Sequence, residues 1–167
     1  MSTASNAIKA GVSLAAIFGA LALAAPGLVE DEGWVTASYN DPAHGAALAT
    51  ACAGVTGAKY GVQAGKRYTQ AECEAMTAQA MLDHALAIQH CTPAGLPLKT
   101  HAAFIRFTYN VGASKTCSST LMKKARAGDL RGACAEIPKW KFAAGREFPG
   151  LVKRRTRERA LCDAGLS

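Results

Sequence analysis

The sequence predicts an α+β protein in which a small β-containing lobe and a larger helical lobe flank a cleft, with a weakly hydrophobic helix at the N-terminus. Two patterns carry this prediction. Residues 69–90 place apolar side chains at three- and four-residue steps, the period of an amphipathic helix, and further helix signals continue to about residue 162. Residues 40–68 are instead punctuated by glycines and contain several β-branched residues. The chain has 167 residues, 50% of them apolar, which suits one domain with its own core. A cleft between two such lobes is a natural site for a polymer substrate.

The N-terminal part of the chain contains a long uncharged segment. Residues 10–29 carry no charge, and twenty residues is the length of a helix that crosses a bilayer core of about 30 Å. Seven Ala and three Gly make the segment only weakly apolar, and we expect Pro26-Gly27 to interrupt its end. A cleaved signal peptide, a permanent anchor and an anchor weak enough to leave the bilayer all fit this composition.

The helices of the larger lobe follow from local signals. Thr69 and Glu72 form a capping box, which starts a helix that we expect to reach about His90 before Pro93. Further helices are expected over residues 102–109, from about 118 to 128, from 129 to before Pro138, and from 150 to about 162. The glycine-punctuated residues 40–68 are expected to form the small β lobe.

The chain contains six cysteines and no CxxC pair. An even count in a small chain indicates disulfides and therefore an oxidising compartment. Cys73 and Cys91 fall at opposite ends of one expected helix, about 27 Å apart, so they cannot pair with each other. Among the remaining pairings we favour Cys52–Cys73, Cys91–Cys117 and Cys134–Cys162, with one or two buried thiols as the alternative.

Basic residues are concentrated near the C-terminus. The net charge is +7, and eight of the nineteen Lys and Arg residues lie between Lys139 and Arg159. Such a run is either a solvated helix face or a surface that attracts a polyanion. An exported, disulfide-bonded chain rarely meets nucleic acid, so we expect no nucleic-acid partner; the bacterial cell wall is an acidic polymer in the right compartment.

Two carboxylates stand out as candidates for catalysis. Eight residues separate Glu32 from Asp41, and eight more separate Asp41 from Thr50. Hydrolysis of a glycosidic bond needs one protonated and one ionised carboxyl group across a cleft. Burial of one of them beside an apolar neighbour such as Trp34 would make their pKa values differ. The alternative is structural: Glu32 caps a helix, and Asp41 precedes a proline in a turn.

Several motifs in one register resemble a known family. Glu32-Gly33, Tyr39-Asn40-Asp41 and residues 50–56 resemble the active-site stretch of phage-type lysozymes, glycoside hydrolase family 24. The resemblance continues through the capping box, residues 107–112 and 117–121, Gly128-Asp129, Trp140 and residues 150–162. It implies a lysozyme-like fold over residues 30–167. The segment before it, residues 1–29, resembles that of signal-arrest-release endolysins, which favours the weak, releasable anchor.

The resemblance also implies roles for individual residues. Glu32 would be the general acid, Asp41 would position and polarise the attacking water, Thr50 would help to hold this water, and Asn110 would bind the glycan. An inverting reaction would place the two carboxyl groups about 6.5–9.5 Å apart. The spacing from Asp41 to Thr50 is three residues longer than usual in the family, which an insertion at a hairpin tip accommodates. No metal and no organic cofactor are implied.

The remaining polar and aromatic residues are given structural interpretations. His44 falls on the inserted turn, and His84, His90 and His101 are expected on helices at the surface or at the edge of the core, not as metal ligands. Trp140 is expected to pack in the core. Arg154 or Arg155 is expected to pair with an acidic residue of the stretch 30–32.

Together these observations predict a monomeric phage endolysin that hydrolyses the β-1,4 bond between N-acetylmuramic acid and N-acetylglucosamine in peptidoglycan. Residues 10–29 would tether it to the host inner membrane on the periplasmic side, and release would free it into the periplasm. While tethered, Glu32 would sit at the lipid surface, three residues after Val29, and the cleft could not assemble. The rival functions are a lytic transglycosylase that uses Glu32 alone and a non-catalytic wall-binding module.

Overall fold

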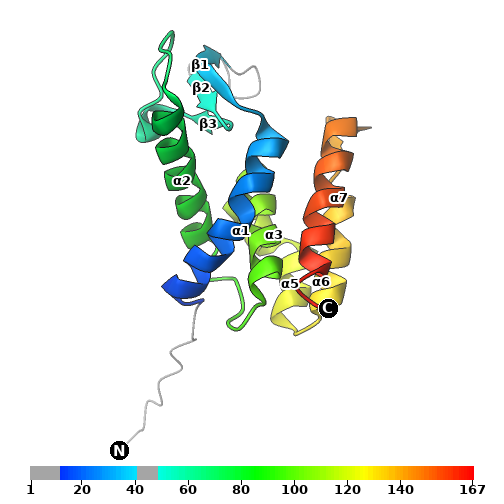
Figure 1. Ribbon diagram of the computed structural model, residues 1–167. Coiled ribbons are helices and arrows are strands. Elements are labelled where there is room, and N and C mark those ends of the chain that lie inside the picture. Colours follow the sequence, from blue (N-terminus) through cyan, green and yellow to red (C-terminus); the bar gives the residue numbers. More distant parts are fainter. Residues whose placement is uncertain (1–11, 41–48) are drawn as a thin grey trace, which may run out of the picture.

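In the computed structural model, which describes residues 12–40 and 49–167, a small β lobe stands on one end of a group of helices (Figure 1). Along the chain, the described elements are α1 (Leu14–Glu32), β1 (Val35–Asn40), β2 (Ala49–Cys52), β3 (Val55–Thr56), the 3-10 helix η2 (Ala58–Tyr60), α2 (Gln70–Ala87), α3 (Leu98–Val111), α4 (Ala113–Ser118), α5 (Thr120–Arg126), α6 (Leu130–Glu136), the 3-10 helix η3 (Ile137–Lys139), β4 (Phe142–Ala143), β5 (Arg146–Glu147) and α7 (Pro149–Asp163). The expected α+β class is confirmed.

Helix α1 packs along α2 and α3 instead of projecting from the protein (Figure 1). One stripe of the helix is buried: Ile17, Ala20, Ala24 and Leu28. The expected interruption at Pro26-Gly27 is wrong, because α1 continues to Glu32. Pro26 lies on the exposed face of the helix, where the carbonyl that loses its amide partner can be hydrated. By length and composition, α1 is the one helix of the described residues that could cross a membrane.

The β lobe is a three-stranded antiparallel sheet in the order β1-β2-β3. It begins at Val35, five residues before the expected start at residue 40, because Val35–Asn40 pairs with β2. Asn40 is opposite Ala49 in this pairing, so residues 41–48 connect two antiparallel strands. Asp41 and His44 lie outside the described residues.

The helices of the helical lobe lie where the sequence signals predict them, with differences at some of their ends. Both hydrogen bonds of the Thr69–Glu72 capping box are present, but α2 ends at Ala87 and not near His90. Helix α3 begins at Leu98, earlier than expected, directly after Pro97. The helix expected from about residue 118 to 128 is confirmed as α5, whereas the short helix α4 before it was not expected. Ser119 caps α5 through its side chain, which explains why α5 begins there.

The C-terminal part contains a hairpin that the sequence patterns did not reveal. Strands β4 and β5 pair antiparallel just before α7, which starts at Pro149. Both strands are two residues long and exposed, so no alternation of apolar residues marks them. Helix α7 then packs against α3, and it buries two of its arginines, Arg154 and Arg155.

Three disulfides join elements that are distant in sequence: Cys52–Cys73, Cys91–Cys117 and Cys134–Cys162. These are the pairs favoured from the sequence, and the structure contains no free cysteine. The first links β2 to α2, so it fixes the β lobe to the helical lobe beside the cleft. Trp140 packs edge-on against Phe107, with ring centroids 5.3 Å apart, at the margin of the main core.

Candidate active site

Glu32 is the last residue of α1, and the chain turns into the β lobe directly after it. Gly33 follows with φ 75°, a conformation that a residue with a side chain rarely adopts. The Glu32 side chain is 21% exposed, so it is largely enclosed but still open to a ligand. Gly54 of the turn between β2 and β3 lies against it: a Cβ atom at Gly54 would be 3.0 Å from Glu32 Oε2.

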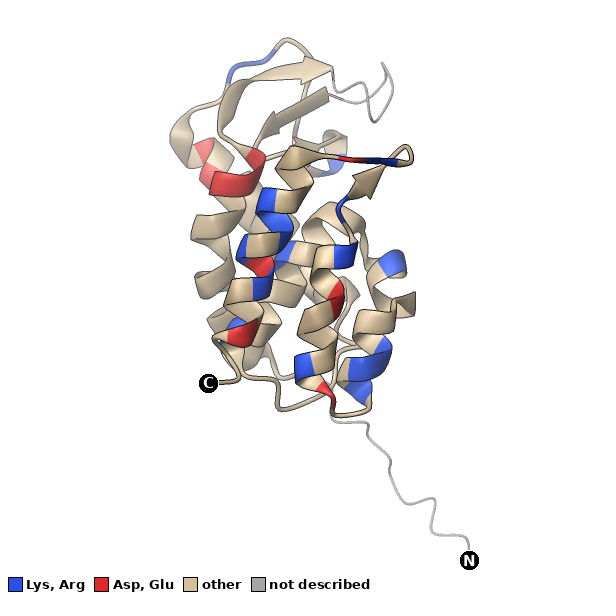
Figure 2. Cartoon of the chain, turned by 90° about the vertical axis from the view of Figure 1, so that its right-hand side faces the viewer, with Lys and Arg blue, Asp and Glu red and all other residues tan. Residues whose placement is uncertain are grey.

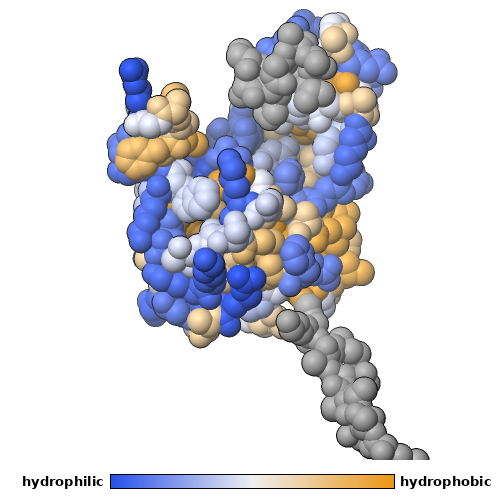
Figure 3. Space-filling view, turned by 180° about the vertical axis from the view of Figure 1, so that it is seen from behind, coloured by the Kyte–Doolittle hydropathy of each residue, from blue (hydrophilic) through white to orange (hydrophobic). Residues whose placement is uncertain are grey.

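A cleft of about 410 Å³ opens beside Glu32, between the two lobes. Seen from behind, the molecule is hollowed between the β lobe and the helical body (Figure 3). Residues from α1, the β lobe, α2 and the end of α3 line the cleft: Glu32, Gly54, Val55, Thr56, Tyr60, Ala80, His84, Tyr109, Asn110, Val111 and Gly112. The sequence analysis placed Glu32 and Asn110 at one site, and the structure brings these two residues to the same cleft.

Thr50 is buried in strand β2, with 1% of its surface exposed. It is opposite Thr56 of β3, and their hydroxyl oxygens are 3.0 Å apart. Thr56 lines the cleft and also donates to the carbonyl of Gly54 at 3.3 Å. Thr50 is therefore connected to the cleft wall by the contact of its hydroxyl with that of Thr56. The sequence analysis quoted Thr56 in a motif but gave it no role.

Asp41 is the next residue after Asn40, the last residue of β1. Because Asp41 lies outside the described residues, the separation of its carboxyl group from that of Glu32 stays a prediction. The sheet register brings the chain on either side of residues 41–48, at Asn40 and Ala49, to adjacent positions next to Thr50.

The carboxylate of Glu32 is paired with a guanidinium group from α7. Arg154 of α7 is 5% exposed and pairs with the Glu32 carboxylate; it also donates from Nε to Glu158 at 3.0 Å. The expected pairing of Arg154 with the acidic stretch is therefore confirmed. Burial alone would lower the pKa of Arg154, but Glu32 and Glu158 outweigh it and raise this pKa. In Figure 2 the acidic end of α1 lies beside the basic residues of α7.

Asn110 takes part in the same group of contacts. Its Oδ1 accepts a hydrogen bond from Arg155, which is otherwise paired with Glu158. This bond fixes the amide plane of Asn110, so that the amide nitrogen remains free to donate to a ligand in the cleft. Arg155, the other candidate for pairing with the stretch 30–32, instead orients Asn110.

The opposite wall of the cleft carries two residues that the sequence analysis did not single out for function. Tyr109 of α3 donates from its hydroxyl to the Ala53 carbonyl at 2.9 Å. Burial raises the pKa of Tyr109, and the nearby charge of Glu32 raises it further, so the hydroxyl stays protonated. His84 of α2, expected at the surface or core edge, lines the cleft and contacts Tyr109 at 5.0 Å between ring centroids. Burial lowers the pKa of His84, which favours the neutral imidazole.

Two other expectations need correction. Trp34 does not border Glu32 in the cleft; it lines a separate apolar groove of about 510 Å³ between α1 and α2. His101 is fully enclosed in α3, with 1% of its surface exposed, and not at the core edge. His101 lies one helical turn before Ile105 on a helix that is buried over most of its surface, so its side chain is enclosed.

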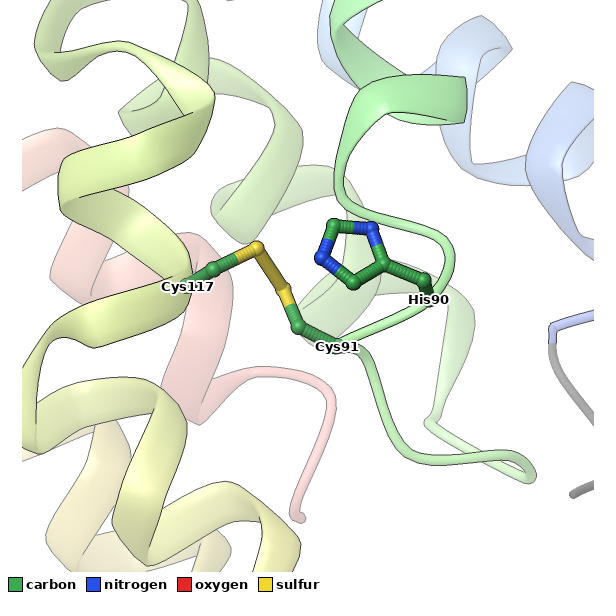
Figure 4. A group of neighbouring side chains, drawn as sticks. All are labelled: His90, Cys91 and Cys117. Carbon is green, nitrogen blue, oxygen red and sulfur yellow. A yellow bond between two sulfur atoms is a disulfide. The ribbon is translucent and has the colours of Figure 1, made fainter.

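A possible metal site among the described residues is not one chemically. His90, Cys91 and Cys117 bring ligand atoms within 4.8 Å of one another. Figure 4 shows, however, that the two sulfur atoms are bonded to each other, so neither is a thiolate. A disulfide lacks the negative charge that makes cysteine a metal ligand. His90 itself lies in the turn after α2 and not on a helix.

Comparisons with known proteins agree with this geometry. A family model for phage lysozyme matches residues 29–158 of the chain. A SAR-endolysin of Bacteriophage PS119 is 38% identical over 113 residues, which are 68% of this chain and 66% of that protein. The chain belongs to the phage lysozyme family. This membership assigns it to the lysozyme-type glycoside hydrolases, as the resemblance of its motifs implied.

Further members of the family support the assignment. A SAR-endolysin of Enterobacteria phage P21 is 36% identical over 113 residues, 68% of this chain and 67% of its own length. The chain thus spans about two thirds of the length of these relatives. Among solved structures, the active form of the P1 phage endolysin Lyz superposes with a TM-score of 0.74 at 21% identity, over 94% of this chain and 97% of that one. The muramidase domain of SpmX from Asticaccaulis excentricus gives a TM-score of 0.72 at 18% identity, over 90% and 96%, and shares the lysozyme fold.

Proposed function

We propose that the protein is an endolysin that hydrolyses the β-1,4 bond between N-acetylmuramic acid and N-acetylglucosamine in peptidoglycan. The observation that carries the proposal is the place of Glu32: a carboxyl group at the end of α1, 21% exposed, in a cleft built from both lobes. An extended glycan strand can pass through such a cleft, which is open at its surface. The amide of Asn110 and the hydroxyl of Thr56 lie along its path.

The reaction needs a proton donor and a positioned water. Glu32 gives its proton to the glycosidic oxygen as the bond to the anomeric carbon breaks. Asp41 orients and polarises a water on the opposite face of the sugar, and Thr50 helps to hold this water through its hydroxyl. Attack from that face inverts the anomeric configuration, and the separation of the carboxyl groups must then be about 6.5–9.5 Å.

The membrane tether belongs to the same proposal. Helix α1 is 19 residues long, and its length and apolar composition are enough for a single weak span. In the folded protein only 22% of its apolar stretch is buried, so the helix is suited to both environments. We infer that residues 10–29 first hold the protein on the periplasmic side of the host inner membrane. Release then lets α1 pack on α2 and α3, which carries Glu32 to the cleft.

Product chemistry distinguishes this proposal from its rivals. Purified peptidoglycan digested in H₂¹⁸O should give fragments with ¹⁸O at a reducing N-acetylmuramic acid, and early NMR spectra should show the α-anomer. A 1,6-anhydro product without ¹⁸O would identify a lytic transglycosylase. Binding without any soluble product would leave only a wall-binding module.

A further inference from the structure

Asp31, the residue directly before Glu32, is the carboxylate that the proposed reaction does not use. Its side chain is completely buried, with 0% exposed, and it does not line the cleft. Three arginines from two other helices surround it: Arg106 of α3, and Arg154 and Arg157 of α7. A buried carboxylate is strongly unfavourable unless it is paired, so this arrangement forms only when α1 lies on α3 and α7.

The contacts fix both the position and the rotation of the end of α1. Arg106 donates from Nη2 to Asp31 and, one turn earlier, to the Gly27 carbonyl at 3.0 Å. A Cβ atom at Gly27 would lie 2.1 Å from Arg106 Nη1, so the guanidinium rests directly on the helix where there is no side chain. On the other side, Arg157 donates from Nε to Asp31 at 2.9 Å. Glu32 follows by one residue and is placed by the same contacts.

Asp31 and Glu32 both lie near the positively charged guanidinium group of Arg154. Arg154 touches Glu32 directly, and its Nε is 3.8 Å from Asp31. Without Asp31, fewer carboxylates would balance the positive charge of the arginines around it. Asp31 supplies negative charge to the same arginines within the protein interior, where charges are weakly screened.

We propose that Asp31 is a positioning residue for Glu32: it seats the end of α1 on α3 and α7, and it balances the charge of the arginines around Glu32. The inference rests on the proposed function, because it gives Glu32 the role of general acid. Among the described residues, Arg154 of α7 contacts Glu32 and also pairs with Glu158, and Tyr109, His84 and Tyr60 line the same cleft.

The test compares Asp31→Asn with Glu30→Gln, using soluble glycan strands of defined length. Glu30 is a matched control: it is on the same turn and 3.2 Å from the same Arg157, but 63% of its side chain is exposed. For Asp31→Asn we expect kcat to fall about tenfold or more, with KM nearly unchanged, because the loss lies in positioning and protonation. The alkaline limb of its pH–activity profile should move to lower pH, whereas Glu30→Gln should keep the wild-type profile.

A second pair of variants covers the case in which Asp31→Asn does not fold. Arg157→Gln removes one cation from the Asp31 side, at a residue that is 36% exposed. Its alkaline limb should move to higher pH, opposite to Asp31→Asn, because Asp31 is then less neutralised. Arg159→Gln, which breaks the more distant pair with Asp163, should not move it.

The outcomes separate the two proposals. If Asp31→Asn and Arg157→Gln lower the melting temperature but leave kcat and both limbs of the pH profile unchanged, Asp31 is only structural and the inference is overturned. The proposed function would stand in that case, provided that Glu32→Gln is inactive. A fully active Glu32→Gln would overturn both.

Discussion

At the scale of single residues, the position of the Glu32 carboxyl group depends on the absence of a side chain at Gly54. The left-handed conformation of Gly54, with φ 70°, turns the chain between β2 and β3 so that its backbone meets the Glu32 carboxyl group without a side chain between them. The cleft beside Glu32 therefore requires a residue without a Cβ atom at position 54.

Gly54→Ala tests this contact. The added Cβ atom would lie 3.0 Å from Glu32 Oε2, so the carboxyl group must move, and we expect activity to fall about tenfold or more. The strained backbone should lower the free energy of unfolding by about 1 kcal/mol. Gly65→Ala is the control, because Gly65 has φ 74° and no atom within 4 Å of the added Cβ. Equal activities of the two variants in a turbidity assay would contradict the account.

The hydroxyl pair of Thr50 and Thr56 gives a second prediction. Thr50→Val keeps the shape of the buried side chain but removes the oxygen 3.0 Å from Thr56 Oγ1. We expect kcat to fall about ten- to a hundredfold, because the water is less well held, with a loss of stability of about 1 kcal/mol. Thr77→Val is the matched control: its hydroxyl is buried and has no hydrogen-bond partner among the described residues. Unchanged kcat in Thr50→Val, measured on soluble glycan strands, would remove Thr50 from the mechanism.

At the scale of helices and strands, the sequence predicts the boundaries that are set by interactions between residues close in sequence. The capping box at Thr69 begins α2 because its two hydrogen bonds need only residues three positions apart. No local pattern of this kind marks the end of α2, the short helix α4 or the hairpin β4–β5. Glu32 and Asn110 were found through motifs, but Tyr109 and His84 were missed because they come from two helices that meet only in the folded chain.

Helix α1 allows the tether to be tested separately from the fold. Ala15 and Ala22 lie on its exposed face, so replacing both with Leu raises the hydropathy of the segment without entering the core. We expect the purified double variant to keep wild-type activity, and the same variant in cells to remain longer in the membrane fraction and delay lysis. The double variant with Ser at both positions should be released sooner. Identical lysis times for both, with equal expression, would count against a tether held by hydropathy.

The whole molecule is held by three disulfides and by a core that includes one buried imidazole. Each disulfide closes a loop of 21 to 28 residues in sequence, a length for which about 3 kcal/mol of stabilisation per bond is typical. His101 lies in the helical lobe with Nδ1 unpartnered, and burial lowers its pKa to about 4. The imidazole is therefore neutral in the folded protein at neutral pH.

This buried imidazole makes stability depend on pH. The unfolded chain takes up a proton at His101 near pH 6.5, whereas the folded chain does so only near pH 4. The free energy of unfolding should therefore fall between pH 6.5 and pH 4, by up to about 3 kcal/mol from this residue, and should not change above that range on its account. Urea titrations of His101→Gln should show a shallower fall over the same interval. Parallel curves for the variant and the wild type would contradict this prediction.

In the proposed reaction, the carboxyl group of Glu32 supplies the proton that breaks the glycosidic bond. The most direct measurement is the kcat of Glu32→Gln on purified peptidoglycan, together with its melting temperature. The kcat of Glu32→Gln should fall at least about a thousandfold in a protein that still folds, because the amide fits the same space but cannot donate an acidic proton. A folded Glu32→Gln protein that retains more than about a tenth of the wild-type rate would contradict it.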